Sequence, residues 1–225
     1  MDDFFRFPST PHLVWLGKDM PRGDKLLSPS EVKSLLFEEV VVEEKIDGAN
    51  LGISRDQDGG LRFQNRGQYL VKPFSGQFSR LTSWQALHEE ELLGLLDTKH
   101  ILFGEWCAAK HSVFYTDLPD VFLLFDVYDR GSRSFWSSTR RNSFALDAGL
   151  LVVPEVFRGM TSLDCLKHTL ANSNSRYRDG PMEGVVIRRE TSQRCEARAK
   201  LVRSDFVQGI GAHWRNRSIE WNRTR

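Results

Sequence analysis

Hydrophobic residues recur along this chain at two spacings, one typical of helices and the other of strands. Helical spacing predicts four helices, at residues 28–39, 79–97, about 138–149 and about 162–172. Two of these segments begin with a capping pattern, Ser28 with Glu31 and Thr161 with Asp164. A further, basic helical segment is expected at about 204–225.

Short apolar runs and alternating runs predict the strands, at 39–45, 49–56, 61–67, 100–108, 120–129, 151–157, 182–190 and 195–203. The sequence DQDGG at 56–60 is a turn signal that joins two of them as a hairpin. Short connections favour antiparallel pairing, so the pattern predicts an α+β fold. No repeat or linker divides the chain, and we therefore expect a single domain over residues 1–225.

The composition is that of a globular protein. Hydrophobic residues make up 40% of the chain and charged residues 27%, and no run of about 18 apolar residues predicts a membrane span. The first residues lack the basic and apolar regions of a signal peptide. The three cysteines have no zinc-ligand spacing, so we interpret them as free thiols in a reducing compartment. We expect a cytoplasmic protein and a monomer.

The net charge of +1 hides an uneven distribution. From Arg188 to Arg225 the chain carries ten Lys and Arg residues against four acidic ones. Such a segment is a candidate surface for a polyanion, and a merely solvated basic end is the alternative interpretation.

Charged and aromatic residues also stand at the ends of apolar strands or inside them. The segments that contain them follow one another along the chain as EKIDGAN, FQNRG, FGEW, LLFDVYD, MEGVVIRR and ARAKLVR. A charge in an apolar strand costs free energy unless it has a partner, so we expect these side chains to converge. Taken alone, Lys45 in the first segment would be interpreted as a solvated lysine.

The ordered series resembles the covalent nucleotidyltransferases, which comprise DNA ligases, RNA ligases and mRNA capping enzymes. The signature Lys-x-Asp/His-Gly stands here as Lys45-Ile46-Asp47-Gly48, followed by Asn50. The chain looks most like the RNA ligases of the phage T4 RNA ligase 2 type, over residues of about 40–206. The resemblance implies an ATP-grasp-like nucleotidyltransferase domain of mainly antiparallel sheets flanked by helices.

The resemblance implies that Lys45 attacks the α-phosphate of ATP and carries AMP. The amine must be neutral to attack, whereas an ordinary lysine titrates at about 10.4. We expect a bound metal ion and the basic residues of ARAKLVR to depress the pKa of Lys45. Lys200 corresponds to one of two family lysines near the α-phosphate. Either Arg198 or Arg203 replaces the other, and the sequence leaves this choice open.

Other positions of the series match residues that bind the nucleotide. Phe125 corresponds to the aromatic that stacks on adenine, with Val186 as the opposite wall, and Glu44 to the contact with the adenine amino group. Their alternatives are a core aromatic for Phe125 and an exposed strand-end charge for Glu44.

The ribose and phosphate contacts complete the implied site. Glu105 matches the glutamate that binds the ribose hydroxyls, and Asn50 and Arg66 match residues near the ribose and phosphates. Arg66 could instead be a surface charge on a hairpin. Glu183 matches the carboxylate that holds Mg²⁺ or Mn²⁺.

The resemblance therefore implies an ATP-dependent RNA ligase, acting in RNA repair. Its substrates would be RNA ends with a 5′-phosphate and a 3′-hydroxyl, and a separate end-healing enzyme could prepare them. The alternatives are an ATP-dependent DNA ligase, a non-catalytic RNA-binding module with the same fold, and a Schiff-base lysine enzyme. DNA ligases normally carry an OB-fold domain after the last motif, and the residues that follow Val202 are too few for one.

Overall fold

A computed structural model describes residues 4–18, 25–208 and 218–225 of the chain. Its strands are β1 (Val40–Lys45), β2 (Ala49–Arg55), β3 (Leu61–Gln64), β4 (His100–Trp106), β5 (Phe122–Asp129), β6 (Ser134–Trp136), β7 (Leu151–Val152), β8 (Glu155–Gly159), β9 (Gly184–Glu190) and β10 (Arg194–Val202). Its helices are α1 (Pro29–Leu35), α2 (Leu81–Leu95), α3 (Ser138–Asp147), α4 (Leu163–Asn172) and α5 (Ser204–Gln208), with a 3-10 turn at Gly76–Phe78.

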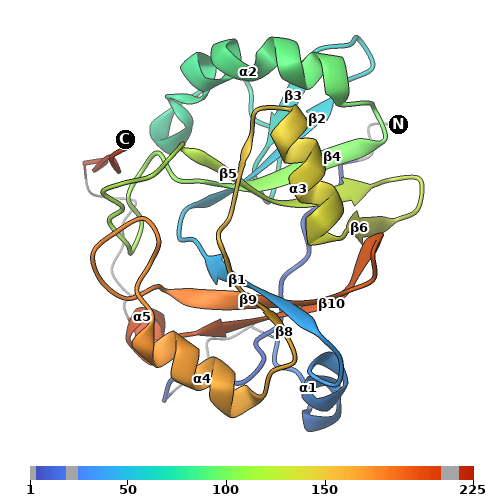
Figure 1. Ribbon diagram of the computed structural model, residues 1–225. Helices are drawn as coiled ribbons and strands as arrows, with labels where there is room; N and C mark the ends of the chain where they lie inside the picture. The colour runs from blue at the N-terminus through green and yellow to red at the C-terminus, as the bar shows by residue number, and fades with distance from the viewer. Residues whose placement is uncertain (1–3, 19–24, 209–217) are drawn as a thin grey trace.

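The strands of the described residues form one sheet that is folded into two halves. Its order is β3-β2-β4-β5-β6-β10-β9-β1-β8, with β7 beside β5. Only β7 pairs in parallel, so the expected mainly antiparallel α+β fold is confirmed. The three-residue β6 pairs briefly with β5 and β10 and joins the halves. We call β3-β2-β4-β5 the first half and β10-β9-β1-β8 the second half; Figure 1 shows them apart from each other.

Each half has its own hydrophobic core on its outer side. Helix α2 packs on the first half through residues such as Leu81, Trp84 and Leu92. Helices α1 and α4 pack on the second half through Leu35 and Leu170. In Figure 1 these helices lie at opposite ends of the molecule. The inner sides of the two halves are therefore left to face each other.

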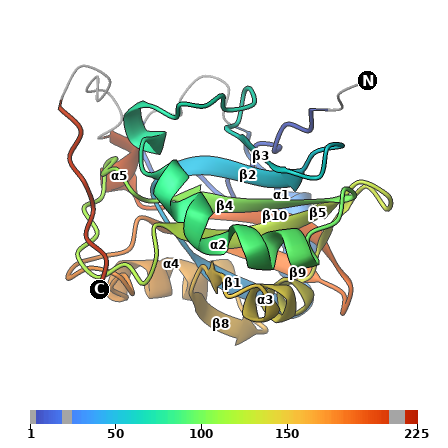
Figure 2. The same cartoon turned by 90° about the horizontal axis from the view of Figure 1, so that it is seen from above.

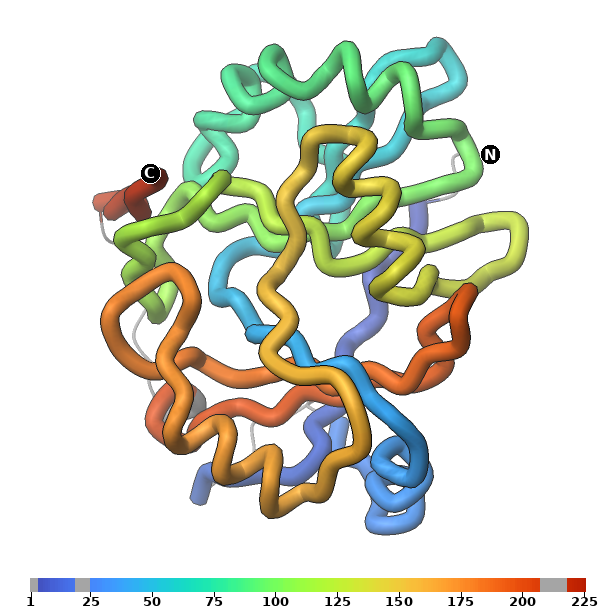
Figure 3. The backbone as a smooth tube through the Cα atoms, in the orientation of Figure 1, coloured from blue at the N-terminus to red at the C-terminus, as the bar shows by residue number. Residues whose placement is uncertain are grey.

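The chain crosses between the halves twice near the same place. It passes from β1 to β2 over residues 46–48, and back from β7 to β8 across Pro154. The single strand predicted at 151–157 is therefore wrong, although its apolar run is continuous. β7 belongs to the first half and β8 to the second, and the tube in Figure 3 shows the segment running from one to the other.

Two other local expectations need correction. The predicted cap at Thr161 is wrong, because the Ser162 hydroxyl accepts the Cys165 N–H at 3.2 Å and begins α4. The helix expected over 204–225 ends at Gln208 where it is described. The predicted helix also covers residues 209–217, which lie outside the described residues. The predicted cap at Ser28 with Glu31 is confirmed.

Residues 218–225 are extended rather than helical. They form isolated bridges with the segment that follows β4, at Ala109 with Trp221 and at Leu118 with Thr224. Their backbone groups bond to this neighbouring segment, so they need no helical hydrogen bonds. Figure 2 shows this last segment running beside the loops of the first half. Trp221 of this segment lies under the Arg80 guanidinium at 4.2 Å.

None of the helices described is long and apolar enough to cross a membrane.

Candidate active site

A pocket of about 420 Å³ lies between the two halves of the sheet. Its wall is formed by strands and by the loop after β3. It includes residues that were predicted from six separate sequence segments: Glu44, Lys45, Asn50, Arg66, Glu105, Phe125, Val186, Arg198 and Lys200. Lys45 is the last residue of β1, at the point where the chain leaves the second half. The predicted convergence of these side chains is therefore seen in the structure.

The amine of Lys45 is held by the carboxylate of Glu183. Its Nζ lies 2.7 and 2.8 Å from the two carboxylate oxygens. Lys45 pairs with Gly184 in the β1–β9 ladder, which places Glu183 at its side. The two side chains are 27% and 12% exposed, so the pair is largely screened from water. Glu183 thus lies at the predicted nucleophile although it was expected only as a metal ligand.

The charges around Lys45 raise its pKa. Burial of the amine opposes its charge, but the carboxylates of Glu183, Glu105 and Asp47 outweigh that effect and hold the pKa above its ordinary value. The expectation that the basic residues of β10 depress the pKa of Lys45 is therefore wrong for the protein without nucleotide or metal. Carboxylates dominate the surroundings of the amine, which stays protonated near neutral pH.

Glu105 shares this crowded environment. Burial, with the neighbouring charges of Asp47 and Glu183, raises the pKa of its carboxyl group to about 7. The charge of Lys45 and a hydrogen bond from the Gly48 N–H, at 2.9 Å, act in the opposite direction. Glu105 is therefore poised to change its charge near neutral pH.

The turn after Lys45 is fixed residue by residue. Ile46 is 4% exposed and packs into a small core. The Asp47 carboxylate accepts the N–H groups of Ser112 and Val113, at 2.7 and 2.8 Å. A Cβ at Gly48 would lie 2.6 Å from the Trp106 carbonyl oxygen, so this close approach of β4 requires glycine. The motif Lys-Ile-Asp-Gly therefore encodes the path of the crossing as well as the lysine that the sequence predicts as the nucleophile.

The pocket also presents apolar side chains and two buried oxygens with unused capacity. Phe125, Val153 and Val186 line it. Glu44 accepts the Arg176 N–H at 2.9 Å through Oε2, but its Oε1 and the Oδ1 of Asn50 find no hydrogen-bond partner among the described residues. Buried acceptors of this kind are costly unless something bonds to them. A flat apolar ligand with donor groups at its edge satisfies these conditions.

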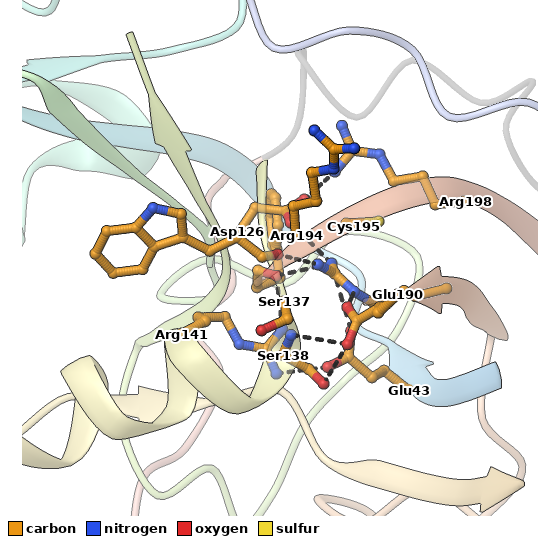
Figure 4. A network of polar contacts seen from close by, with 12 residues as sticks. Glu43, Asp126, Ser137, Ser138, Arg141, Glu190, Arg194, Cys195 and Arg198 are labelled. Atoms are coloured by element: carbon orange, nitrogen blue, oxygen red, sulfur yellow. Dashed lines mark hydrogen bonds and ion pairs between the residues drawn. The ribbon is translucent and has the colours of Figure 1, made fainter. Parts of the chain in front are cut away.

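A buried network of ion pairs supports the pocket from the β5 side (Figure 4). Arg188, 1% exposed, bonds Asp126 at 2.8 Å and Glu190 at 2.5 Å. Arg141 on α3 bonds Glu43 at 2.5 Å and the Phe125 carbonyl at 2.6 Å. These residues were not predicted as part of the site. The only signal in the sequence was the presence of charges inside apolar strands.

The structure separates the two arginines between which the sequence could not choose. Arg198 lines the pocket, pairs with Asp126 and lies over the rings of Phe7 and Phe135, at 4.6 and 4.1 Å. Arg203 does not line the pocket and pairs with Asp205 at 3.1 Å. Of these two arginines, only Arg198 therefore lines the pocket together with Lys200.

The basic residues from Arg188 onward lie in different environments. Arg188 is buried in the ion-pair network, and Arg198 and Lys200 line the pocket. Arg215 and Arg217 lie outside the described residues. Arg188 is therefore buried and cannot contribute to a polyanion surface, whereas the role of the other described basic residues of this segment stays a prediction.

The first described segment also contributes to the pocket, which sequence reasoning missed. Phe7, Ser9 and Thr10 line it. The segment is tied to the first half by Phe5, which stacks on Tyr128 at 3.6 Å, and to β10 by backbone bonds. The only sequence signal was the run of aromatic residues FFRF, which has no regular spacing.

A family model described as RNA ligase matches residues 38–202, from just before β1 to the end of β10. This chain belongs to the RNA ligase family. The match contains every residue that was predicted for the site, with Arg203 alone beyond it among the alternatives. The family resemblance inferred from the motifs is confirmed.

Solved structures of an RNA ligase have a fold similar to that of this chain. A mutant Naegleria gruberi RNA ligase with ATP and Mn is similar with a TM-score of 0.68 and 17% identity, over 92% of this chain and 59% of the other. Another mutant, with AMP and Mn, has a TM-score of 0.65 and 15% identity, over 92% and 59%. The same ligase with PPi has a TM-score of 0.60 and 17% identity, over 88% and 58%. No curated protein sequence matches the chain.

These likenesses confirm the predicted nucleotidyltransferase fold of RNA ligases. The chain spans less than two thirds of the length of the ligase structures that it matches.

We expect ionisation of Glu105 to destabilise the ligand-free RNA ligase fold. The folded-state pKa of about 7 lies above the ordinary 4.5, so the folded protein holds this proton more tightly than the unfolded chain does. Stability is therefore lost as the pH rises through this range. Glu105→Gln removes the titrating group, and urea unfolding at about pH 5 and about pH 8 should show a larger gain over wild type at the higher pH.

The exposed Glu38, changed to Gln, is the matched control for this titration. A Glu105→Gln variant whose stability differs from wild type equally at both pH values would contradict the raised pKa.

Proposed function

We propose that this chain is the adenylyltransferase domain of an ATP-dependent RNA ligase and that Lys45 carries AMP. The observation that carries the proposal is the position of the Lys45 amine, in the pocket and 2.7 Å from Glu183, among the other residues predicted for a ligase. Membership of the RNA ligase family supports the same reaction. The similar Naegleria ligase structures with ATP and with AMP support the choice of nucleotide.

The proposed reaction has three nucleotidyl transfers. Once the Lys45 ammonium has lost one proton, its Nζ attacks the α-phosphorus of ATP; a P–N bond forms, the bond to pyrophosphate breaks and the amine loses a second proton. An oxygen of the RNA 5′-phosphate then attacks the same phosphorus, and the lysine leaves and takes up a proton. Finally the 3′-hydroxyl attacks the 5′-phosphorus of the adenylylated end and loses its proton; a phosphodiester bond forms and AMP leaves.

The apolar side chains of the pocket suit adenine. Phe125 and Val186 would enclose the two faces of the base, and Val153 adds apolar surface. The unpartnered Oε1 of Glu44 would accept a hydrogen bond from the adenine amino group. Guanine carries a carbonyl oxygen at that position, which would repel the carboxylate. The site is therefore proposed to favour ATP over GTP.

The ribose and phosphates would lie toward Lys45. Glu105 and Asn50 are neighbours across the β2–β4 ladder, and their oxygens would accept bonds from the ribose hydroxyls. Arg66 on the loop after β3, with Lys200 and Arg198 on β10, would contact the phosphates. These three positive charges would stabilise the charge that develops on the pyrophosphate as it leaves.

The residues fit a divalent metal that arrives with the nucleotide. Among residues 4–18, 25–208 and 218–225 no group of three or more His, Cys, Asp or Glu side chains could hold a metal by itself. Mg²⁺ and Mn²⁺ are often held by one or two carboxylates with phosphates and water, and Glu183 offers one such carboxylate beside Lys45. A bound metal would supply positive charge at the phosphates and at the carboxylates around the amine.

RNA with a 5′-phosphate and a 3′-hydroxyl is the proposed substrate, in repair of broken strands. The family supports RNA over DNA, and the reactive lysine in its pocket supports catalysis over a binding module. A separate enzyme would prepare ends of other chemistry.

The location and oligomeric state of this chain are also proposed. Its cysteines Cys107, Cys165 and Cys195 are free, which supports a reducing, cytoplasmic location. We propose that the protein acts as a monomer.

Incubation with ATP and Mg²⁺ should add one AMP to the protein, measured by intact mass. GTP should add far less, and chelation of the metal should prevent the reaction. Lys45→Arg keeps a charge for Glu183 but lacks the nucleophilic amine, so it should gain no AMP. The matched control is Lys33→Ala, which removes an exposed lysine on α1 and should label as wild type does. Equal labelling of Lys45→Arg and wild type would refute the proposal.

Arg198, and not Arg203, should be the partner of Lys200 in the first transfer. We expect Arg198→Gln to slow transfer of AMP to the protein by roughly 100-fold, because a fixed positive charge at the phosphates is lost. Arg198→Lys should lie between this variant and wild type. Arg203→Gln should change the rate less than about twofold, since its guanidinium bonds Asp205 away from the pocket.

Single-turnover transfer of labelled AMP measures these rates, with circular dichroism to verify folding. A slow Arg203→Gln beside a normal Arg198→Gln would reverse the assignment.

A further inference from the structure

The segment 218–225, which we call the strap, lies along the loop of residues 107–118 that follows β4. Three backbone N–H groups of the strap, those of Asn222, Arg223 and Arg225, donate to carbonyl oxygens of this loop, each at 3.0 Å. The loop returns bonds from its own N–H groups to the strap, at 2.8 and 3.1 Å. The two segments are far apart in the sequence but form one irregular ribbon.

The side chain of Asn222 joins the two limbs of the 107–118 loop. It is 4% exposed. Its Oδ1 accepts the Tyr115 N–H at 2.9 Å, and its Nδ2 donates to the carbonyl oxygens of Cys107 and Ala109, at 2.8 and 3.2 Å. Both amide hydrogens and the carbonyl oxygen are therefore used, and no other single side chain type offers this set of groups in the same shape.

The 107–118 loop in turn holds the crossing that presents Lys45. The Tyr115 hydroxyl accepts the Asp47 N–H at 2.8 Å, and the loop N–H groups of Ser112 and Val113 bind the Asp47 carboxylate. Asp47 is two residues from Lys45. A continuous path of hydrogen bonds thus runs from Asn222 through Tyr115 to the turn that carries the amine.

We propose that Asn222 is a positioning residue for the transfer of AMP to Lys45. It fixes the 107–118 loop, the loop fixes Asp47, and Asp47 fixes the direction of the lysine side chain. This inference rests on the proposed function of Lys45. No residue of the strap lines the pocket. The strap therefore affects the orientation of the Lys45 amine and leaves the binding of ATP unchanged.

Displacement of a reacting atom by about 1 Å can cost about 100-fold in rate. We therefore expect Asn222→Ala to slow single-turnover transfer of AMP at saturating ATP by about 10- to 100-fold, and Tyr115→Phe to slow it similarly, because both break the same path. The dissociation constant of a non-hydrolysable ATP analogue should stay within about twofold. The double variant should be little slower than either single variant, since both interrupt the same path from Asn222 to Asp47.

The matched control is Arg225→Ala on the same strap, whose guanidinium pairs with the exposed Asp117 at 3.1 Å. It should transfer AMP as wild type does. If Asn222→Ala and Tyr115→Phe transfer AMP at the wild-type rate, or lose affinity for the analogue in proportion to rate, the positioning role is wrong. Tyr115→Phe removes one hydroxyl only and decides the question if Asn222→Ala does not fold.

Amide hydrogen exchange supplies a second readout that needs no ligase activity. In the ligand-free protein, Asn222→Ala should speed exchange at the N–H groups of Ser112 and Val113, which bind Asp47. Unchanged exchange at both would overturn the path. If the wild-type protein takes up no AMP, the proposed function is wrong. The exchange experiment would still test whether the strap fixes the 107–118 loop and Asp47.

Discussion

The crossing of the chain between the two halves of the sheet sets the position of everything else in the pocket. Only residues 46–48 separate β1 from β2, so Lys45 must end one half at the point where the other begins. The crossing stays in place because Asp47 is anchored by two backbone N–H groups and because Gly48 lets the β4 backbone approach closely. A lysine at this point faces the space that two separate hydrophobic cores leave between them.

Charge is distributed unevenly around that space. Carboxylates gather at the Lys45 amine, where they raise its pKa, while arginines gather at Glu43 and Asp126 beneath Phe125. The buried arginines hold the Phe125 carbonyl from two sides, at 2.6 and 3.2 Å, which fixes the backbone of the proposed base-stacking residue. Buried ion pairs of this kind contribute more to a defined geometry than to net stability. The site thus combines apolar side chains, whose backbone is held by buried arginines, with a cluster of carboxylates at the Lys45 amine.

Much of the pocket could be predicted from the sequence because its residues mark strand ends. A charge beside an apolar strand, such as Glu105 or Lys200, already signals a need for a partner. The contacts that escaped prediction join segments far apart without any periodic pattern. Arg188 meets Asp126 through pairing that only the folded sheet creates, and Asn222 meets the 107–118 loop in an irregular ribbon. The sequence did not predict that the chain crosses between the halves at Pro154, because apolar residues continue on both sides of this proline.

The central claim is that the Lys45 amine itself becomes bonded to AMP. Peptide mapping by tandem mass spectrometry, after the protein has reacted with ATP and Mg²⁺, tests this claim at the level of the atom. The account predicts AMP on the peptide that contains Lys45, attached at Nζ through an acid-labile P–N bond. AMP found on any other residue of the protein, or a Lys45 peptide that stays unmodified while ligation proceeds, would contradict it.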